Sequence, residues 1–191
     1  MFVPRLKALL QRFRDDTRGS ITVETVIALP LLFWAAAASY DFHEIHRYKS
    51  AREKATFTVA DMISREQLPI TNNYMDQTRQ VFNDMVGDGE NNQIRISVVE
   101  YNANDDIYEL KWSESRGTGD LEPLMDEDVR TAHDTLPILT DGQQIILVEA
   151  FSTFNSLFSV GLSIPVDIET RIFTAPRFAP KVDYQAVLGQ G

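Results

Sequence analysis

A single carboxylate, Glu24, lies near the start of an otherwise uncharged apolar run. Placing an ionised group in hydrocarbon costs roughly 2.5–3.5 kcal/mol by insertion measurements, so such a group usually has a partner. Cleavage after Gly19 would give Ser20 a new α-amino group and make Glu24 the fifth residue of the mature chain. A carboxylate and an ammonium attract strongly at low dielectric. We therefore expect Glu24 of one chain to meet the Ser20 amine of a neighbour; the alternative is that Glu24 snorkels to the cytoplasmic interface.

The three histidines are the next residues that could do chemistry. His43 and His46 are three positions apart beside two carboxylates, which makes a metal site geometrically possible. We favour the simpler interpretation that they are polar residues on a helix surface just outside a membrane. His133 has no serine nucleophile motif such as G-x-S-x-G to work with, so we interpret it as an ordinary surface residue.

The acidic and glycine-bearing loops do not match known ligand-binding motifs. Asp105 and Asp106, and the run from Asp126 to Asp128, lack the alternating ligand spacing of an EF-hand loop. Gly117 and Gly119 are too few for a phosphate-binding loop. The chain contains no cysteine, which excludes disulfides, thiolate metal sites and a cysteine nucleophile. The sequence predicts a protein that is not an enzyme and has no cofactor and no metal site.

The segment from Ile21 to Tyr40 has the length of a membrane span. Its 20 residues would form a helix of about 30 Å, which matches the hydrocarbon thickness of a bilayer. Pro30 lies within it, but membrane helices tolerate proline when neighbours satisfy the freed carbonyl. Trp34 and Tyr40 suit the outer interface. The sequence predicts one membrane crossing.

Charge is distributed unevenly along the chain. Residues 1–18 carry a net charge of +3, whereas residues 55–191 contain 22 acidic and 9 basic side chains, a net charge of −13. Basic residues beside a span resist translocation, so we expect a cytoplasmic N-terminus and an acidic domain in the periplasm. Such an acidic surface disfavours nucleic acid as a partner.

The N-terminal region also has features of a secretory signal peptide. Ala36-Ala37-Ala38 before Ser39 resembles an A-x-A cleavage site. The apolar run is longer than the usual 7–15 residues, however, and it contains Glu24. Three alternatives remain open: cleavage after Gly19, an uncut membrane anchor, and cleavage after Ala38.

Beyond the span, the sequence predicts that the helix continues as an amphipathic stalk and ends before Pro69. Apolar residues recur every three or four positions, which marks one helix face; they are Phe42, Ile45, Tyr48, Ala51, Ala55, Val59 and Met62. The intervening charged residues are expected to face solvent; they are Asp41, Glu44, Arg47, Lys49, Arg52, Glu53 and Lys54. The predicted organisation is a basic leader (1–19), a transmembrane segment (20–40), a helical stalk (41–66) and an extracytoplasmic α+β head (67–191).

The head is expected to be a small antiparallel sheet packed on the long helix. A short helix is predicted near residues 74–85, closed by Gly87 and Gly89, and a second near 129–136. A hairpin with strands near 94–98 and 108–112 is predicted from alternating apolar residues, with turn residues between the strands. Further strands are predicted at 144–153 and 166–174, and an acidic loop at 113–128.

The N-terminal motif resembles a known family. Arg18-Gly19-Ser20-Ile21-Thr22-Val23-Glu24, followed by Ala28-Leu29-Pro30-Leu31-Leu32, is similar to the N-terminus of TadE/TadG-like pseudopilins of the tight-adherence (Tad, or Flp) pilus system. The similarity is specific over about residues 12–40 and loose over the helix to Ser64. The segment from Asp167 to Phe173 vaguely resembles the family's C-terminal strand.

The resemblance implies a minor pilin-like component that is cut by a prepilin peptidase at the cytoplasmic face. It implies Gly19 before the scissile bond, Ser20 as the new terminus and Glu24 as an assembly residue. The expected partners are the inner membrane, other pilins or pseudopilins and the Tad assembly platform. Ser20 differs from the aromatic residue of major type IV pilins, and the TadG branch often keeps its leader. A single-pass anchored interaction or sensing domain remains an alternative function.

Overall fold

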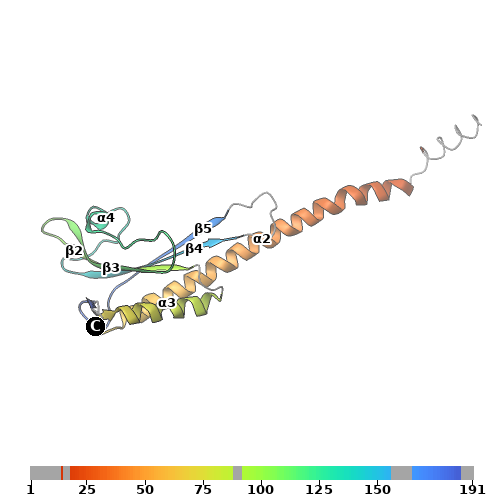
Figure 1. The fold of residues 1–191 in the computed structure, drawn as a ribbon. Helices are drawn as coiled ribbons and strands as arrows, with labels where there is room; N and C mark the ends of the chain where they lie inside the picture. The colour runs from red at the N-terminus through yellow and green to blue at the C-terminus, as the bar shows by residue number, and fades with distance from the viewer. Residues whose placement is uncertain (1–13, 15–17, 88–91, 156–164, 186–191) are drawn as a thin grey trace, which may run out of the picture. The chain divides into compact units, whose positions relative to one another are not determined.

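The computed structural model describes residues 14, 18–87, 92–155 and 165–185 of the chain (Figure 1). The chain divides into two compact units. The first comprises Met1–Glu44 with Ser156–Ser163, and the second comprises Ile45–Asn155 with Ile164–Gly191. The second unit contains the residues of the expected α+β head together with the helix from Ile45 onward, and it contains all of the described strands. We call this whole second unit the head from here on.

Helix α2 spans Arg18–Ser64, 47 residues, and so confirms the expected long N-terminal helix. Pro30 lies inside it and has no N–H to donate to the carbonyl of the residue four positions earlier. Hydroxyls on either side turn back onto the helix: Thr25 Oγ1 donates to the Ile21 carbonyl at 2.7 Å, and Ser39 Oγ donates to the Ala35 carbonyl at 2.8 Å. This back-bonding satisfies the hydroxyls where the helix surface is apolar.

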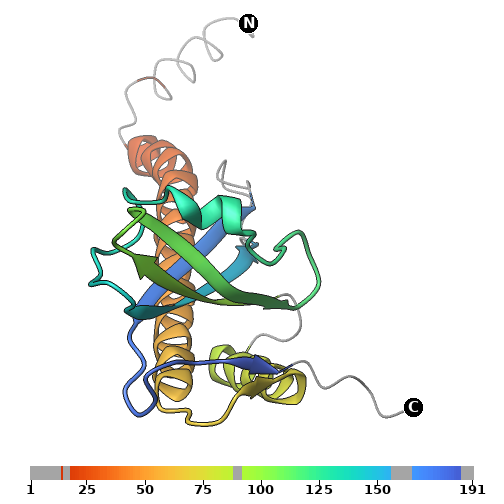
Figure 2. The ribbon, with the colours of Figure 1, turned by 90° about the vertical axis from the view of Figure 1, so that its left-hand side faces the viewer.

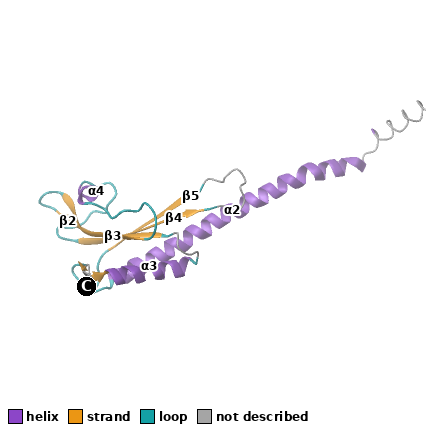
Figure 3. Cartoon of the chain, viewed as in Figure 1, coloured by secondary structure: helices purple, strands orange, loops and turns teal. Residues whose placement is uncertain are grey.

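The head contains a four-stranded antiparallel sheet of order β3-β2-β4-β5 (Figures 1 and 3). Its strands are β2 (Gln93–Asn102), β3 (Ile107–Arg116), β4 (Gln144–Phe154) and β5 (Val166–Thr174). The predicted hairpin is confirmed as β2 and β3. Register shifts between Val98 and Val99, which pair with Trp112 and Leu110, so Lys111 is the extra residue of a β-bulge.

One face of the sheet packs against the C-terminal part of α2 and against α3 (Asn72–Val86). The shared core is formed by alternate residues of the strands and by one helix stripe; it contains Ala55, Val59, Ala60, Ile63, Ile70, Met75, Phe82, Ile94, Ile96, Val98, Ile146, Val148, Ala150 and Val182. Figure 2 shows α3 beside α2.

Thr71 caps the start of α3 by accepting from the Tyr74 N–H. Gly87, with φ 72°, ends α3 in the left-handed conformation that glycine favours.

The opposite face of the sheet carries a second, smaller core. It lies under α4 (Asp126–Arg130) and the following turn, and it contains Val99, Tyr108, Val129, Leu136, Leu139 and Ile145. Val98 and Val99 are consecutive in β2 and therefore point to the two different cores. Both faces of the sheet are thus partly covered.

A short parallel pair was not predicted. β1 (Ile70–Thr71) pairs with β6 (Tyr184–Gln185) in a separate two-stranded sheet. Each strand has two residues, which is too short for an alternating pattern to be visible in the sequence. The pair fixes the C-terminal segment beside the start of α3.

Two predicted boundaries were wrong. The expected loop at 113–128 begins later, because β3 continues through Arg116. The expected helix at 129–136 is instead α4, which starts at Asp126. Three carboxylates occupy the first turn of α4, where negative charge interacts favourably with the positive end of the helix dipole and so favours a helix that starts at this point. In addition, Asp128 Oδ2 accepts the Met125 N–H at 2.8 Å.

The predicted faces of the stalk were wrong at three positions. Asp41 and Arg52 were expected in solvent but are each 2% exposed, whereas Phe42 was expected on the packed face and is 64% exposed. For Arg52 the reason is visible: its guanidinium donates to Ser152 Oγ at 2.5 Å and Asn92 Oδ1 at 3.1 Å. It also lies 3.0 Å from the centre of the Tyr48 ring. A buried cation is tolerated when its donors are satisfied in this way.

Candidate functional site

The predicted site residues all lie near the start of α2. Gly19 and Ser20 are in its first turn, and Glu24 follows one turn later with an exposed side chain. Ser20 and Glu24 are four positions apart, which is about one turn of the helix. Cleavage after Gly19 and a contact between Glu24 and a neighbouring chain stay predictions.

An exposed apolar surface surrounds Glu24. Large apolar side chains between residues 21 and 34 are 45–71% exposed. These are Ile21, Val23, Val26, Ile27, Leu29, Leu31, Leu32, Phe33 and Trp34. Within the described residues, α2 is the one helix long and apolar enough to cross a membrane, judged by length and composition alone. Contiguous apolar surface of this extent marks a contact with lipid or with other proteins.

The histidines occupy two different settings. His43 and His46 are exposed on α2, and no group of three or more potential metal ligands is found in the part of the chain that the structure describes. His133 Nε2 lies 3.2 Å from Asp106 Oδ1, which also accepts from the Tyr101 hydroxyl at 2.6 Å. The hydrogen bonds from Tyr101 and then His133 hold the pKa of Asp106 below its usual value. His133 is therefore an exposed residue of the head whose ring lies beside Tyr108 of the second core.

A fully buried carboxylate lies within the sheet and was missed by the sequence analysis. Glu149 of β4 is 0% exposed and stands directly opposite Arg95 of β2 and Arg171 of β5. Each of its oxygens takes one guanidinium at 2.7 Å: Arg95 Nη2 contacts Oε2, and Arg171 Nη2 contacts Oε1. This ion triad spans three strands and fixes their register, since a shift of one residue would move each charge to the other face.

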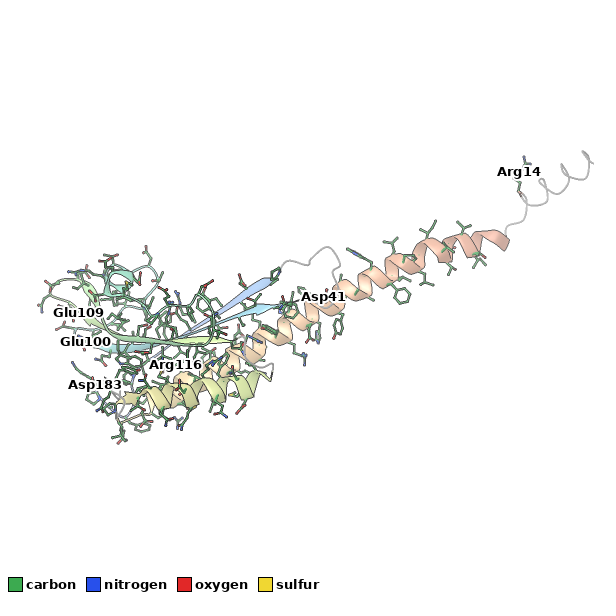
Figure 4. The ribbon with its side chains drawn as sticks, in the orientation of Figure 1. Arg14, Asp41, Glu100, Glu109, Arg116 and Asp183 are labelled. Atoms are coloured by element: carbon green, nitrogen blue, oxygen red, sulfur yellow. The ribbon has the colours of Figure 1, made fainter. Side chains whose placement is uncertain are left out.

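A second charged group is centred on Glu100 of β2, which is labelled in Figure 4, and its other members come from β3, β4 and the C-terminal segment. Lys111 and Lys181 contact its two carboxylate oxygens at 3.2 and 3.1 Å, and Gln144 Nε2 donates to it at 2.9 Å. Burial alone would raise the pKa of Glu100, but the hydrogen bonds from Gln144, Lys181 and Lys111 outweigh it and lower the pKa.

Trp112 and Arg116 of β3 hold the C-terminal segment in place. Trp112 Nε1 donates to the Val182 carbonyl at 2.7 Å, and its ring stacks on Tyr184 with centroids 5.4 Å apart. Arg116 donates to Asn72 Oδ1 at 2.7 Å and contacts Asp76 at 2.9 Å. These contacts use aromatic and charged groups to join β3, α3 and β6.

The charged groups of the head thus make contacts within the head itself. Glu149, Glu100 and Arg116 each bind partners from other elements and so tie those elements together. Comparison with models of protein families found no match for the chain, and comparisons with curated proteins and with solved structures found no similar protein.

Proposed function

We propose that this chain is a minor pilin-like subunit, a TadE/TadG-like pseudopilin of a tight-adherence pilus, which assembles through its N-terminal helix. It is held in the inner membrane by residues 20–40, with the basic leader in the cytoplasm and the head in the periplasm. Its partners are other pilins or pseudopilins, the Tad assembly platform and a prepilin peptidase that cuts after Gly19.

The observation that carries the proposal is the exposure of Glu24 on a helix that is apolar around it. The apolar side chains from Ile21 to Trp34 gain from burial, at about 25 cal/mol per Å² of apolar area. Lipid or neighbouring helices can supply that burial, but only a polar partner can satisfy Glu24. In a bundle of identical helices, the Ser20 amine of a neighbour is a partner of opposite charge at nearly the same depth.

Orientation and processing follow from the leader. Its net charge of +3 over residues 1–18 keeps the N-terminus in the cytoplasm under the positive-inside rule. A peptidase at the cytoplasmic face then reaches the bond between Gly19 and Ser20. Cleavage creates the ammonium group that the assembly model requires.

Glu24→Gln tests the assembly role. The variant keeps the size of the side chain and removes its charge, so we expect normal membrane insertion and a reduction of roughly tenfold or more in the amount recovered in sheared pilus fractions. Carbonate extraction measures insertion. Glu53→Gln is the matched control, because it makes the same change further along α2, outside the apolar segment. Equal recovery of the Glu24 variant and the control would refute the assembly role.

A second candidate function is a membrane-anchored extracytoplasmic interaction or sensing domain unrelated to pili. The head favours it, because its two cores and its ion triad are complete without the N-terminal segment. In that case Glu24 interacts with the cytoplasmic interface, and neither cleavage nor assembly depends on it.

A further inference from the structure

The sheet of the head has two outer strands, β3 and β5, whose free edges differ. An exposed edge presents N–H and C=O groups that can pair with another strand, and proteins usually blunt such edges with bulges, lysines or covering segments. The β3 edge is blunted in this way. It carries the bulge at Lys111, and Asp126 Oδ1 accepts the Leu110 N–H at 3.1 Å.

Within residues 18–87, 92–155 and 165–185, the β5 edge shows none of these features. All nine residues of β5 pair with β4 in one unbroken register, without bulge, lysine or proline (Figure 1). Among the described residues, the backbone of β5 makes no backbone–backbone hydrogen bond except to β4. Alternate N–H and C=O groups of an outer strand point away from its neighbour. No strand of the described part of the chain pairs with these groups.

A groove beside this edge would receive side chains of an added strand. It has a volume of about 440 Å³ and lies between α2 and the C-terminal half of β5. Its apolar wall consists of Phe57, Ala60, Ile172 and Phe173. Phe57 is 60% exposed, so its ring does not contribute fully to the core of the head. An exposed aromatic side chain next to an open strand edge is a typical anchor for a bound peptide.

The side chains of β5 indicate which kind of strand fits. Ile168 and Thr170 are buried on the side of α2, whereas Asp167 and Glu169 are exposed on the other side. Arg171 also lies on that other side, where it contacts Glu169 at 3.3 Å and the buried Glu149 at 2.7 Å, so the exposed part of this face keeps a net negative charge. A complementary strand has apolar residues towards α2 and basic residues opposite the two carboxylates. The net charge of −13 on residues 55–191 also attracts a cationic segment over longer distances.

We propose that the free edge of β5 binds an extended segment of another protein, with alternating apolar and basic residues, as an additional strand of the sheet. The apolar side chains enter the groove at Phe57, and the basic side chains pair with Asp167 and Glu169. This surface belongs to the head alone, so the proposal does not depend on pilus assembly.

Two peptides matched in length to β5 test the proposal, one alternating lysine with valine and the other alternating glutamate with valine. Binding to the full chain in neutral detergent micelles is measured by fluorescence anisotropy. We expect the lysine peptide to bind roughly tenfold or more tightly than the glutamate peptide. Hydrogen exchange of β5 amides should slow when it binds, which locates the peptide independently of any substitution.

Substitutions on the surface distinguish binding at the free edge of β5 from nonspecific attraction of a cationic peptide to an acidic protein. Phe57→Ser should weaken binding of the lysine peptide by roughly tenfold, and Glu169→Gln by about threefold. The controls are Ile138→Ser, at a side chain that is 97% exposed, and Glu127→Gln on α4; neither should change the affinity. Absence of binding, equal losses in the controls, or unchanged β5 exchange would overturn the proposal. Self-association of the chain through β5 would also overturn it, by assigning the edge to a second copy.

Discussion

At the residue scale, buried charge is the most consequential feature of the head. Glu149 is inaccessible to solvent and depends on two arginines that approach from neighbouring strands. Removal of one partner from a buried ion pair is far more damaging than its net contribution suggests, because a charge is left without compensation. The triad is therefore the site at which single substitutions should have the largest effect.

We predict that Arg95→Met lowers the free energy of unfolding by about 2–4 kcal/mol. The measurement is urea unfolding followed by Trp112 fluorescence in a Trp34→Phe background. Arg65→Met is the matched control; it removes an exposed i,i+4 pair with Asp61 and should cost less than about 0.5 kcal/mol. Similar losses in both variants would contradict the prediction, because they would show that removing a partner of the buried Glu149 costs no more than removing an exposed ion pair.

The titration of Glu100 gives a pH prediction. Its pKa is lowered in the folded head, so its contribution to stability is complete above the ordinary value of 4.5 and is lost as the pH falls below that value through the lower folded pKa. Glu100→Gln should therefore flatten the fall in stability in this acidic range. Thermal unfolding at a series of pH values checks this, and an unchanged slope in the variant would contradict it.

At the element scale, the long helix and the sheet could be predicted, whereas their connections could not. The predicted range of β5, before Pro176 ends regular structure, matches the strand, and the predicted range of α3 differs by at most two residues at each end. The register that places Arg95 and Arg171 beside Glu149 depends on residues far apart in sequence. The β1–β6 pair is too short to leave a pattern. Arg52 was assigned to solvent because its buried hydrogen-bond partners come from other segments.

The end of α3 offers a test of backbone conformation. Gly87 has φ 72°, and a Cβ placed there meets nothing within 4 Å, so any loss on substitution comes from the backbone. We predict that Gly87→Ala lowers stability by about 1–2 kcal/mol and that Gly87→Asn costs less, because asparagine tolerates the left-handed region. Urea unfolding of both variants provides the comparison. Equal losses would assign the effect to something other than backbone conformation.

At the scale of the whole molecule, the two units have different solvent requirements. The head contains both hydrophobic cores, whereas the apolar side chains between residues 21 and 34 are exposed. We predict that the full chain needs detergent and that a fragment of residues 45–191 is soluble and unfolds cooperatively. Size-exclusion chromatography and thermal unfolding followed by circular dichroism measure these properties. An unfolded fragment would mean that the head depends on the N-terminal unit.

The assembly role that we propose for Glu24 requires a chain that begins at Ser20. Its most direct test is the intact mass and N-terminal sequence of the native protein extracted from membranes. We expect a start at Ser20, with Glu24 retained as the fifth residue. A start at Met1 would leave an uncut anchor without the required ammonium group. A start at Ser39 would remove Glu24 altogether and contradict the assembly mechanism.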